Sequence, residues 1–310
     1  MPHKNNNKLS FSLAIIIVGF NNEKSIRECL YSLFKNFLGK NPIKGKIVFI
    51  DNKSSDRTVE TVTKLREFYP CLNIIENRIN VGFAKAVNQG IRFAQEKYNP
   101  DFFMLLNPDA KIETENFINI AIERIRNHPT KPIIVSPKIT KAYKEDSDKS
   151  TGGNKVWFEG GKIDWFKQKV VHEKTKDSLA ENKKIVSTDF ISGCAMIFNK
   201  KTIEKIGLLD ERFFLFYEDA DFCFRAKKAG GKLAIFPDLE VCHIESVSFS
   251  KEDIKTYHLV KSGLLFFHKH SPYRFRPFFW IKFYIRFFYH KFFSKKAIVV
   301  KAMKNFKEEI

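Results

Sequence analysis

The chain has 310 residues, of which 44% are hydrophobic, and its formal net charge at neutral pH is +19. This composition excludes a mainly disordered protein and suits one large α/β domain with an appendage. The charge favours an anionic partner, and on charge alone nucleic acid, anionic lipid and a phosphorylated substrate all stay open.

The first half of the chain alternates short apolar runs with helical patterns. Apolar runs bounded by polar turns predict buried strands at residues 13–18, 46–50, 72–76 and 102–106. Apolar residues spaced three or four apart predict helices at residues 25–37, 56–68 and 84–97. The alternation predicts a Rossmann-like α/β fold, whose mostly parallel sheet carries helices on both faces.

The pattern changes after residue 137. Residues 138–187 are rich in Lys, Asp and Gly, which predicts a loop-and-hairpin excursion. The α/β pattern then resumes, with strands expected at 194–198 and 232–236 and helices at 200–206 and 219–229. We therefore expect one α/β domain over residues 1–248.

Residues 249–310 form an expected C-terminal extension that is helical, basic and aromatic. From Pro272 onward ten Lys or Arg stand against two acids, so this segment carries +8 of the total charge. Three interpretations stay open: a helical hairpin packed on the domain, an amphipathic element at an anionic membrane surface, and a segment that binds single-stranded nucleic acid. We favour the membrane surface, because cations attract headgroups and aromatic rings suit the interface.

Neither a secretory signal nor a spanning segment is predicted. The apolar run at 13–18 is too short for a signal core, and no stretch of about 20 uncharged apolar residues exists. The five cysteines are scattered and form no CxxC, which suits a reducing compartment. These observations predict a cytoplasmic protein.

Polar clusters follow three of the predicted strands, at the sheet edge where open α/β sheets bind ligands. Asp51 ends the second strand and can accept from a base N–H or a ribose hydroxyl, whereas Asp56 is expected only to cap the next helix. Gly82, within residues 80–88, would let the backbone approach a phosphate before a helix. No GxGxxG is present, which counts against a dinucleotide-dependent oxidoreductase.

A metal site is expected at the end of the fourth strand. Asp109 follows Asn107 and Pro108 there and is placed to hold Mg²⁺ or Mn²⁺ on a diphosphate, unless the run is a plain turn. His243 follows another strand-like segment. A lone histidine is more often structural, and its case as a metal ligand depends on having Asp109 as its partner.

The most distinctive stretch, residues 213–225, places Glu218, Asp219 and Asp221 directly behind a run of aromatic residues. At a helix start the dipole favours the ionised carboxylates. Asp221 can pair with Arg225 four residues on, which leaves the other two acids for chemistry. A carboxylate in an aromatic cleft suits a general base for a sugar hydroxyl; the alternative is a solvated helix start.

In this order and spacing, the motifs resemble the family-2 glycosyltransferases of the GT-A fold, and among them the rhamnosyltransferase-like branch. The similarity covers about residues 12–246, through motifs at 18–22, 51–56, 80–88, 107–109, 192–196, 207–213 and 217–225 and at His243. It implies inverting transfer from dTDP-rhamnose or a UDP-sugar to a hydroxyl of a glycan or lipid-linked acceptor in cell-surface polysaccharide synthesis. It also implies Mg²⁺ or Mn²⁺ as cofactor.

The resemblance divides the domain into a nucleotide-binding half, about residues 10–110, and an acceptor half, about residues 111–248. By position, it implies Asp219 as catalytic base, with Glu218 and Asp221 at the acceptor. The nucleotide-binding residues would be Phe20, Asn22, Asp51, Asn80, Gly82 and Asn88, and the metal ligands Asp109, Asn107 and His243. Gly193 and the loop with Trp157 and Trp165 would lie near the sugars. Asn107 departs from the family's first acid, which predicts weaker metal binding.

Two rival functions stay open. A basic protein that binds single-stranded nucleic acid would explain the charge but not the three carboxylates at 218–221. A metal-dependent nucleotidyltransferase would use carboxylates and metal, but it usually needs two acids on one strand edge, where this chain has Asn107.

Overall fold

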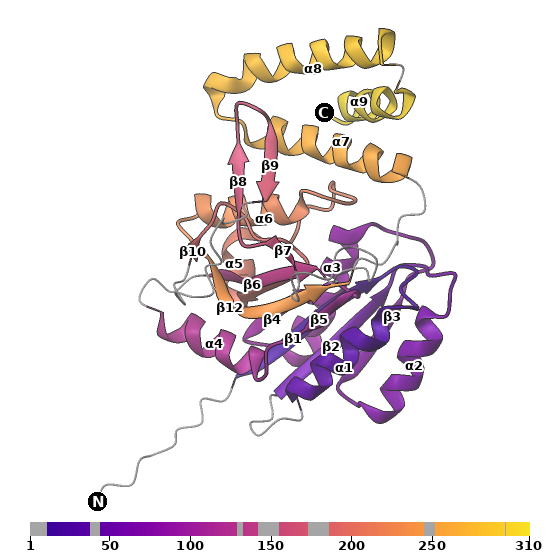
Figure 1. The fold of residues 1–310 in the computed structure, drawn as a ribbon, viewed down its shortest axis with the longest axis vertical. Helices are drawn as coiled ribbons and strands as arrows, with labels where there is room; N and C mark the ends of the chain where they lie inside the picture. The colour runs from indigo at the N-terminus through magenta and orange to yellow at the C-terminus, as the bar shows by residue number, and fades with distance from the viewer. Residues whose placement is uncertain are drawn as a thin grey trace, which may run out of the picture.

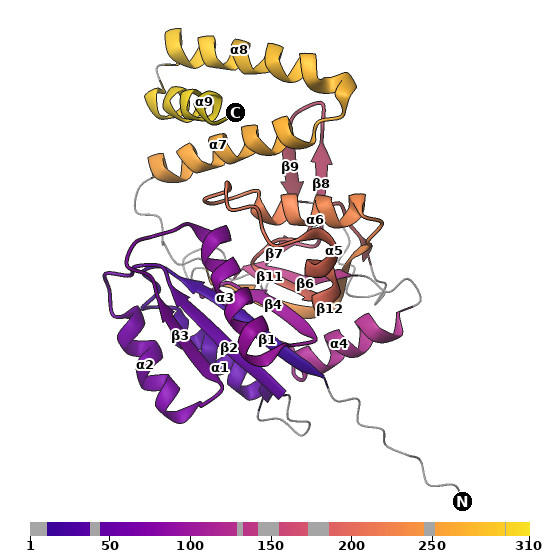
Figure 2. The ribbon, with the colours of Figure 1, turned by 180° about the vertical axis from the view of Figure 1, so that it is seen from behind.

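The computed structural model describes residues 11–37, 44–128, 133–141, 155–172, 186–244, 252–294 and 296–310. These residues form a sheet-centred α/β body, and a layer of three C-terminal helices lies at one end of it (Figures 1 and 2). The sheet order is β10-β12-β6-β11-β4-β1-β2-β3.

The N-terminal half has the expected βαβ architecture. Its four strands are parallel, in the spatial order β4-β1-β2-β3, and the central strands β1 and β4 are buried almost throughout. The strands are β1 (Ser12–Gly19), β2 (Lys44–Asp51), β3 (Leu72–Glu76) and β4 (Phe102–Leu106), and the helices are α1 (Ile26–Phe37), α2 (Thr58–Phe68) and α3 (Phe83–Tyr98). Because the chain reverses its direction across the sheet between β1 and β4, their carboxyl ends flank the position where such sheets bind ligands.

The second half extends the same sheet beyond β4. Strand β11 is antiparallel to β4 and to β6, and β12 runs parallel to β6. Its strands are β5 (Ala110–Ile112), β6 (Ile134–Lys141), β7 (Lys155–Phe158), β10 (Val186–Ser187), β11 (Ala195–Asn199) and β12 (Leu233–His243), and its helices are α4 (Phe117–Asn127), α5 (Lys200–Ile206) and α6 (Glu218–Lys228). One large hydrophobic core lies under both halves.

Two strands differ from the sequence-based expectation. Strand β12 does not end at residue 236 but continues to His243, across a register shift between Phe236 and Glu240. The proline and charges in this stretch hide the strand from pattern analysis. Strand β6 extends through residues that were expected to be irregular. The predicted excursion does contain a hairpin, β8 (Gly161–Asp164) and β9 (Lys169–His172).

The extension consists of α7 (Glu252–His270), α8 (Arg276–Phe292) and α9 (Ala297–Glu309). The β8–β9 hairpin projects from the sheet toward these helices (Figure 1). None of the helices in the described ranges is both long and apolar enough to cross a bilayer. The expected domain boundary at residue 248 stays a prediction. Helix α7, which follows that boundary, packs on the loop before α6.

Helix α8 has two dissimilar faces. Phe279 and Phe283 are almost fully buried and contact Phe306 of α9. The opposite face leaves large apolar side chains in solvent, namely Ile281, Tyr284, Ile285, Phe288, Tyr289 and Phe292. An apolar face of this extent is unusual for a surface that contacts only water.

Candidate active site

The end of β2 presents a carboxylate oxygen that no described residue satisfies. Asp51 is 3% exposed, and its Oδ2 accepts the backbone N–H groups of Lys53 and Ser54 at 3.1 and 3.0 Å. Its Oδ1 is buried without a hydrogen-bond partner among the described residues. A buried acceptor of this kind is costly unless a ligand donates to it.

Asn22 and Phe20 form the loop after β1, beside Asp51. Asn22 is buried; its Oδ1 accepts from the Phe20 N–H at 2.7 Å, and its own N–H donates to Thr58 Oγ1. Phe20 is half-buried at the strand end. Asp56 was expected to cap α2; its Oδ1 does accept from the Thr58 N–H at 3.0 Å, but the residue at the N-cap position is Arg57.

Asn80 and Gly82 shape the entry to α3. Asn80 Oδ1 accepts from the Gly82 N–H and from Asn52 Nδ2, so Asn52 connects the ends of β2 and α3. Gly82 adopts φ +85°, and a Cβ there would lie 2.7 Å from the Phe214 carbonyl oxygen. The packing of the loop before α6 therefore requires glycine at this position, whether or not a ligand also approaches the backbone there.

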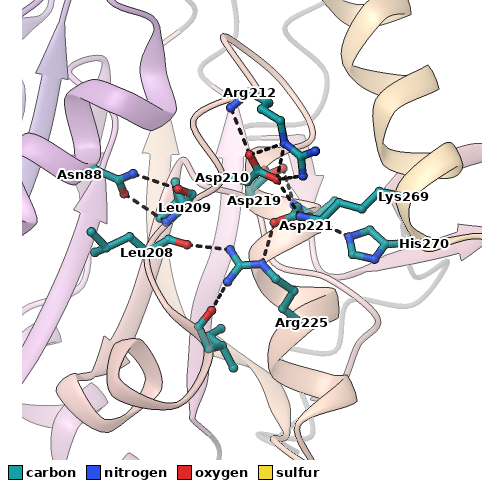
Figure 3. A network of polar contacts seen from close by, with 12 residues as sticks. Asn88, Leu208, Leu209, Asp210, Arg212, Asp219, Asp221, Arg225, Lys269 and His270 are labelled. Atoms are coloured by element: carbon teal, nitrogen blue, oxygen red, sulfur yellow. Dashed lines mark hydrogen bonds and ion pairs between the residues drawn. The ribbon is translucent and has the colours of Figure 1, made fainter. Parts of the chain in front are cut away.

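Asn88 differs from its expected role. Its side chain is buried, donates to the Leu209 carbonyl and to Glu211, and accepts from the Leu209 N–H (Figure 3). All of these partners belong to the protein, so Asn88 fastens α3 to the loop at 208–211. We therefore leave it out of the proposed nucleotide site.

Asp109 and His243 lie side by side, because β5 pairs with β12 and sets Ala110 opposite His243. The distance between His243 Nε2 and Asp109 Oδ1 is 3.1 Å, and both side chains are largely buried. Asn107, two residues away, is half-buried. The carboxylate oxygen suits Mg²⁺ or Mn²⁺, whereas an imidazole nitrogen is less suited to Mg²⁺.

The described residues contain no group of three or more His, Cys, Asp or Glu side chains that could enclose a metal. The pair Asp109 and His243 therefore fits a cation that takes its remaining ligands from a bound diphosphate and water. It does not fit a structural metal held by protein alone.

The loop before α6 adopts a strained backbone. Phe216 and Tyr217 both have φ +66°, a conformation that is costly for bulky side chains. Helix α7 supports this loop: Ser262 Oγ donates to the Leu215 carbonyl at 2.8 Å, and the Tyr217 ring packs on Phe266. Strain of this kind persists only where the surroundings impose it, and it concentrates at functional sites.

Asp219 follows this loop directly. Its Oδ2 accepts the Gly193 N–H at 3.0 Å and its Oδ1 the Ala220 N–H at 2.7 Å. Burial raises the pKa of Asp219 above its ordinary value, although these two donors and nearby His172 act in the opposite direction. A carboxylate with a raised pKa is a stronger base than an exposed aspartate.

Glu218 is 6% exposed, and its Oε2 is buried without a hydrogen-bond partner among the described residues. Burial and the charges of Asp219 and Asp221 raise the pKa of Glu218 well above its ordinary value. The larger upward shift favours a proton on Glu218 over one on Asp219, which leaves Asp219 as the candidate to accept a proton.

The metal pair and Asp219 are connected through one short segment. The Gly193 N–H donates to Asp219, and the next residue, Cys194, accepts the Asn107 N–H at 2.9 Å. On the other side, the Trp157 ring lies 5.1 Å from His243 and 4.8 Å from His172. The segment at 193–194 thus contacts both Asp219 and the loop that contains Asn107 and precedes Asp109.

Asp221 differs from the expected acceptor role. It is fully buried, and its carboxylate binds Arg225 at 2.8 Å, Lys269 at 2.5 Å and His270 at 2.7 Å (Figure 3). Burial opposes its ionisation, but the bonds to His270, Arg225 and Lys269 outweigh burial and lower the pKa of Asp221. With no exposed surface, Asp221 cannot touch an acceptor, and it joins α6 to α7 instead.

No sequence pattern indicates the residues of α7 that support the site. Ser262, Lys269 and His270 all bind the segment at 210–221. The pairing of Asp221 with Arg225 was predicted from their spacing, but no local pattern indicates partners almost 50 residues later. His172 was also missed, because a lone histidine in a Gly- and Lys-rich stretch carries no signal.

Comparison with known proteins defines the family. The model named "Glycosyl transferase family 2" matches residues 14–207. The chain is 27% identical over 220 residues to the low-salt glycan biosynthesis hexosyltransferase Agl10 of Haloferax volcanii, covering 70% of this chain and 62% of that protein. It is 22% identical over 218 residues to the N-acetylglucosaminyl-diphospho-decaprenol L-rhamnosyltransferase of Mycobacterium tuberculosis, covering 66% of this chain and 68% of that protein.

Solved structures show the same fold. GalNAc-T7 with UDP, GalNAc and Mn²⁺ superposes with a TM-score of 0.59 at 15% identity, over 83% of this chain and 51% of that one. The mannosyltransferase PcManGT from Pyrobaculum calidifontis with GDP-Man and Mn²⁺ gives 0.56 at 15% identity, over 96% and 74%. The chain therefore belongs to glycosyl transferase family 2 and has the GT-A fold.

Proposed function

We propose that this chain is an inverting glycosyltransferase that uses a nucleotide-diphosphate sugar. The observation that carries the proposal is the segment at 193–194, which fastens Asp219 on one side and the Asn107 loop beside Asp109 on the other. A base on one side of a sugar and a diphosphate site on the other suit a single in-line displacement. Neither a protein that binds single-stranded nucleic acid nor a nucleotidyltransferase would need a base and a diphosphate site on opposite sides of a sugar.

In the proposed reaction Asp219 accepts the proton of the acceptor hydroxyl, whose oxygen bonds to the anomeric carbon of the donor. The bond from that carbon to the diphosphate oxygen breaks at the same time, so the anomeric configuration inverts. Asp109 and His243 would hold Mg²⁺ or Mn²⁺, which offsets negative charge on the departing diphosphate. The unsatisfied Asp51 Oδ1 would accept from the base or the ribose of the donor.

The relatives support the substrate classes. Agl10 is named a hexosyltransferase, and the Mycobacterium protein a rhamnosyltransferase acting on a diphospho-decaprenol. The chain spans 62% of the length of Agl10, so the substrates of the whole relative are carried over only as a proposal. We propose a dTDP-rhamnose or UDP-sugar donor and a lipid-linked glycan as acceptor.

We also propose that the outer face of α8 lies on an anionic membrane. Its exposed apolar stripe includes Ile285 at 65% and Phe292 at 58% exposure. Residues 272–310 carry a net charge of +8, which complements anionic headgroups. Aromatic and apolar side chains on one face, with Lys and Arg nearby, are typical of an interfacial helix.

A thermal-shift panel of dTDP- and UDP-sugars with and without Mn²⁺ tests the enzyme proposal. A donor that binds only the folded state raises the melting temperature according to its affinity. We expect one nucleotide series to stabilise the protein and Mn²⁺ to increase the effect. No stabilisation by any donor, together with strong salt-dependent binding of single-stranded DNA, would favour the nucleic-acid-binding alternative.

A further inference from the structure

A pocket of 580 Å³ lies where the β8–β9 hairpin meets the extension. Both ribbon views place the hairpin against α7 and α8 (Figures 1 and 2). The hairpin supplies residues 167–170, α7 supplies residues 259–267, and α8 supplies residues 282–286. The residue just before the candidate base pair, Tyr217, forms part of its wall.

Four cationic side chains line this pocket: Lys167, Lys169, Lys282 and Arg286. Among the described residues Arg286 has no hydrogen bond or ion pair, and it is open to solvent. The Lys282 ammonium donates to the carbonyls of Phe166 and Lys167 at 3.1 Å each, so no carboxylate neutralises it directly.

The electrostatics of Lys282 show that these cations repel one another. Burial and the positive charges of Lys169 and Arg286 lower its pKa, and Asp164 offsets this effect only in part. The four cations thus outnumber the one acid at the pocket. Bringing like charges together costs free energy unless an anion binds between them.

The floor of the pocket is apolar. Leu264 and Phe267 of α7 and Phe283 of α8 are almost fully buried beneath it. At the rim Leu259 is 46% exposed. On α8 Ile285, which belongs to the apolar stripe from Ile281 to Phe292, is next in sequence to Arg286. An anion with a hydrocarbon chain fits this combination better than a free inorganic anion does.

The pocket is one strand away from the candidate base. Strand β9 begins at Lys169 in the pocket and ends at His172, whose charge acts on Asp219. Four residues of strand cover roughly 10 Å. This length of strand between Lys169 and His172 is comparable to one sugar unit with its phosphate, which is the spacing that an acceptor reaching from Asp219 to the pocket requires.

We propose that this pocket binds the diphosphate of an isoprenoid-linked acceptor, with Arg286 and Lys169 as its ligands and the lipid chain leaving along α8. The assignment rests on the proposed transferase function and specifies its acceptor. It differs from the membrane proposal, since one molecule is recognised here by its diphosphate.

Titration calorimetry with farnesyl diphosphate tests the proposal, with EDTA present so that the donor metal site stays empty. The variant Arg286→Gln with Lys169→Gln should weaken binding about tenfold or more, because two charge-assisted contacts are lost. The matched control, Lys301→Gln with Lys304→Gln, removes the same charge from the basic pocket between α8 and α9 and should bind like the wild type. Inorganic pyrophosphate, which lacks the chain, should bind more weakly than farnesyl diphosphate.

Several results would overturn the proposal. If both double variants lowered the affinity for farnesyl diphosphate equally, the binding would be unspecific electrostatic attraction. If pyrophosphate bound as tightly as farnesyl diphosphate, the pocket would not recognise the lipid chain. Vesicles of phosphatidylglycerol that displace farnesyl diphosphate would identify the ligand as a bulk headgroup. Nucleotide-sugar turnover, measured separately on a soluble alkyl glycoside, shows whether the transferase proposal stands when the pocket proposal fails.

Discussion

At the scale of single residues, two adjacent carboxyls have different chemistry because their surroundings differ. Asp219 receives two backbone N–H donors, whereas Glu218 Oε2 receives none from the described residues. Burial acts on both, but only Glu218 also takes its large shift from two neighbouring acids. Of the pair, Glu218 is the group whose protonated form is favoured more, and Asp219 is the candidate base.

Glu218→Gln should therefore leave transfer within about threefold of the wild type, since the amide resembles the protonated acid. Because the folded state raises the pKa of Glu218, the folded protein binds more protons than the unfolded chain above the ordinary glutamate value. The free energy of unfolding then falls as pH rises, by at most about 1.4 kcal/mol per unit for one group. The substitution should remove the share of this slope that Glu218 contributes in urea titrations above the ordinary glutamate pKa, whereas the share of Asp219, whose pKa is also raised, should stay. Loss of transfer with the slope intact would make Glu218 the ionised base.

At the scale of elements, α7 supports the candidate active site. Lys269 and His270 at its C-terminal end bind Asp221 of α6, and Ser262 holds the strained loop before the base. Gly263 lets the helix approach closely, since a Cβ there would lie 3.2 Å from the Tyr217 ring. The extension therefore positions Asp219 through contacts that cross the expected domain boundary.

Asp221→Asn should destabilise the protein by about 3–5 kcal/mol, because Arg225 and Lys269 lose a buried counter-charge and His270 loses a hydrogen-bond partner. The folded state lowers the pKa of Asp221, so its contribution is present above the ordinary aspartate value and is lost as pH falls through the lowered one. Urea denaturation at neutral pH measures the change. Glu60→Gln is the control, since its pair with Lys64 is exposed and should be nearly neutral. Equal stability of both variants would contradict the structural role of Asp221.

The sequence predicts the parallel half of the sheet well, because its strands are continuous apolar runs and its helices have clear periodicity. It predicts less of the acceptor half: Pro237 and the bulge after Phe236 disguise β12, so the neighbourhood of Asp109 and His243 depended on the family resemblance. Asn88 and Asp221 were expected to contact ligands. Polar residues in a motif support structure as often as substrate, and only their partners distinguish the two roles.

At the scale of the whole molecule, α8 lies at one end, away from the sheet (Figure 1), and this helix both carries the apolar stripe and lines the candidate acceptor pocket. A membrane against α8 would bring a lipid-linked acceptor to the pocket without removing its chain from the bilayer. In this arrangement the positive charge of the extension would hold the membrane and the acceptor near Asp219.

Ile285→Glu with Phe288→Glu should lower cosedimentation with phosphatidylglycerol vesicles about tenfold, since two apolar anchors become acidic. The control is Phe68→Glu on α2, which is 75% exposed and far from α8 in sequence and in Figure 1. This variant also replaces an exposed apolar side chain by an acidic one, but outside the stripe, so the protein should sediment with vesicles like the wild type. A loss shared by both variants, or by neither, would contradict the membrane assignment.

The most direct measurement compares Asp219→Asn with the wild type in two assays: the affinity for Mn²⁺ with nucleoside diphosphate, and the rate of transfer from bound donor. We expect affinity within about threefold and a rate reduced about 10²- to 10⁴-fold, because the substitution removes a base without touching the pair at Asp109 and His243. Affinity that collapses while bound donor still reacts at the wild-type rate would contradict the account.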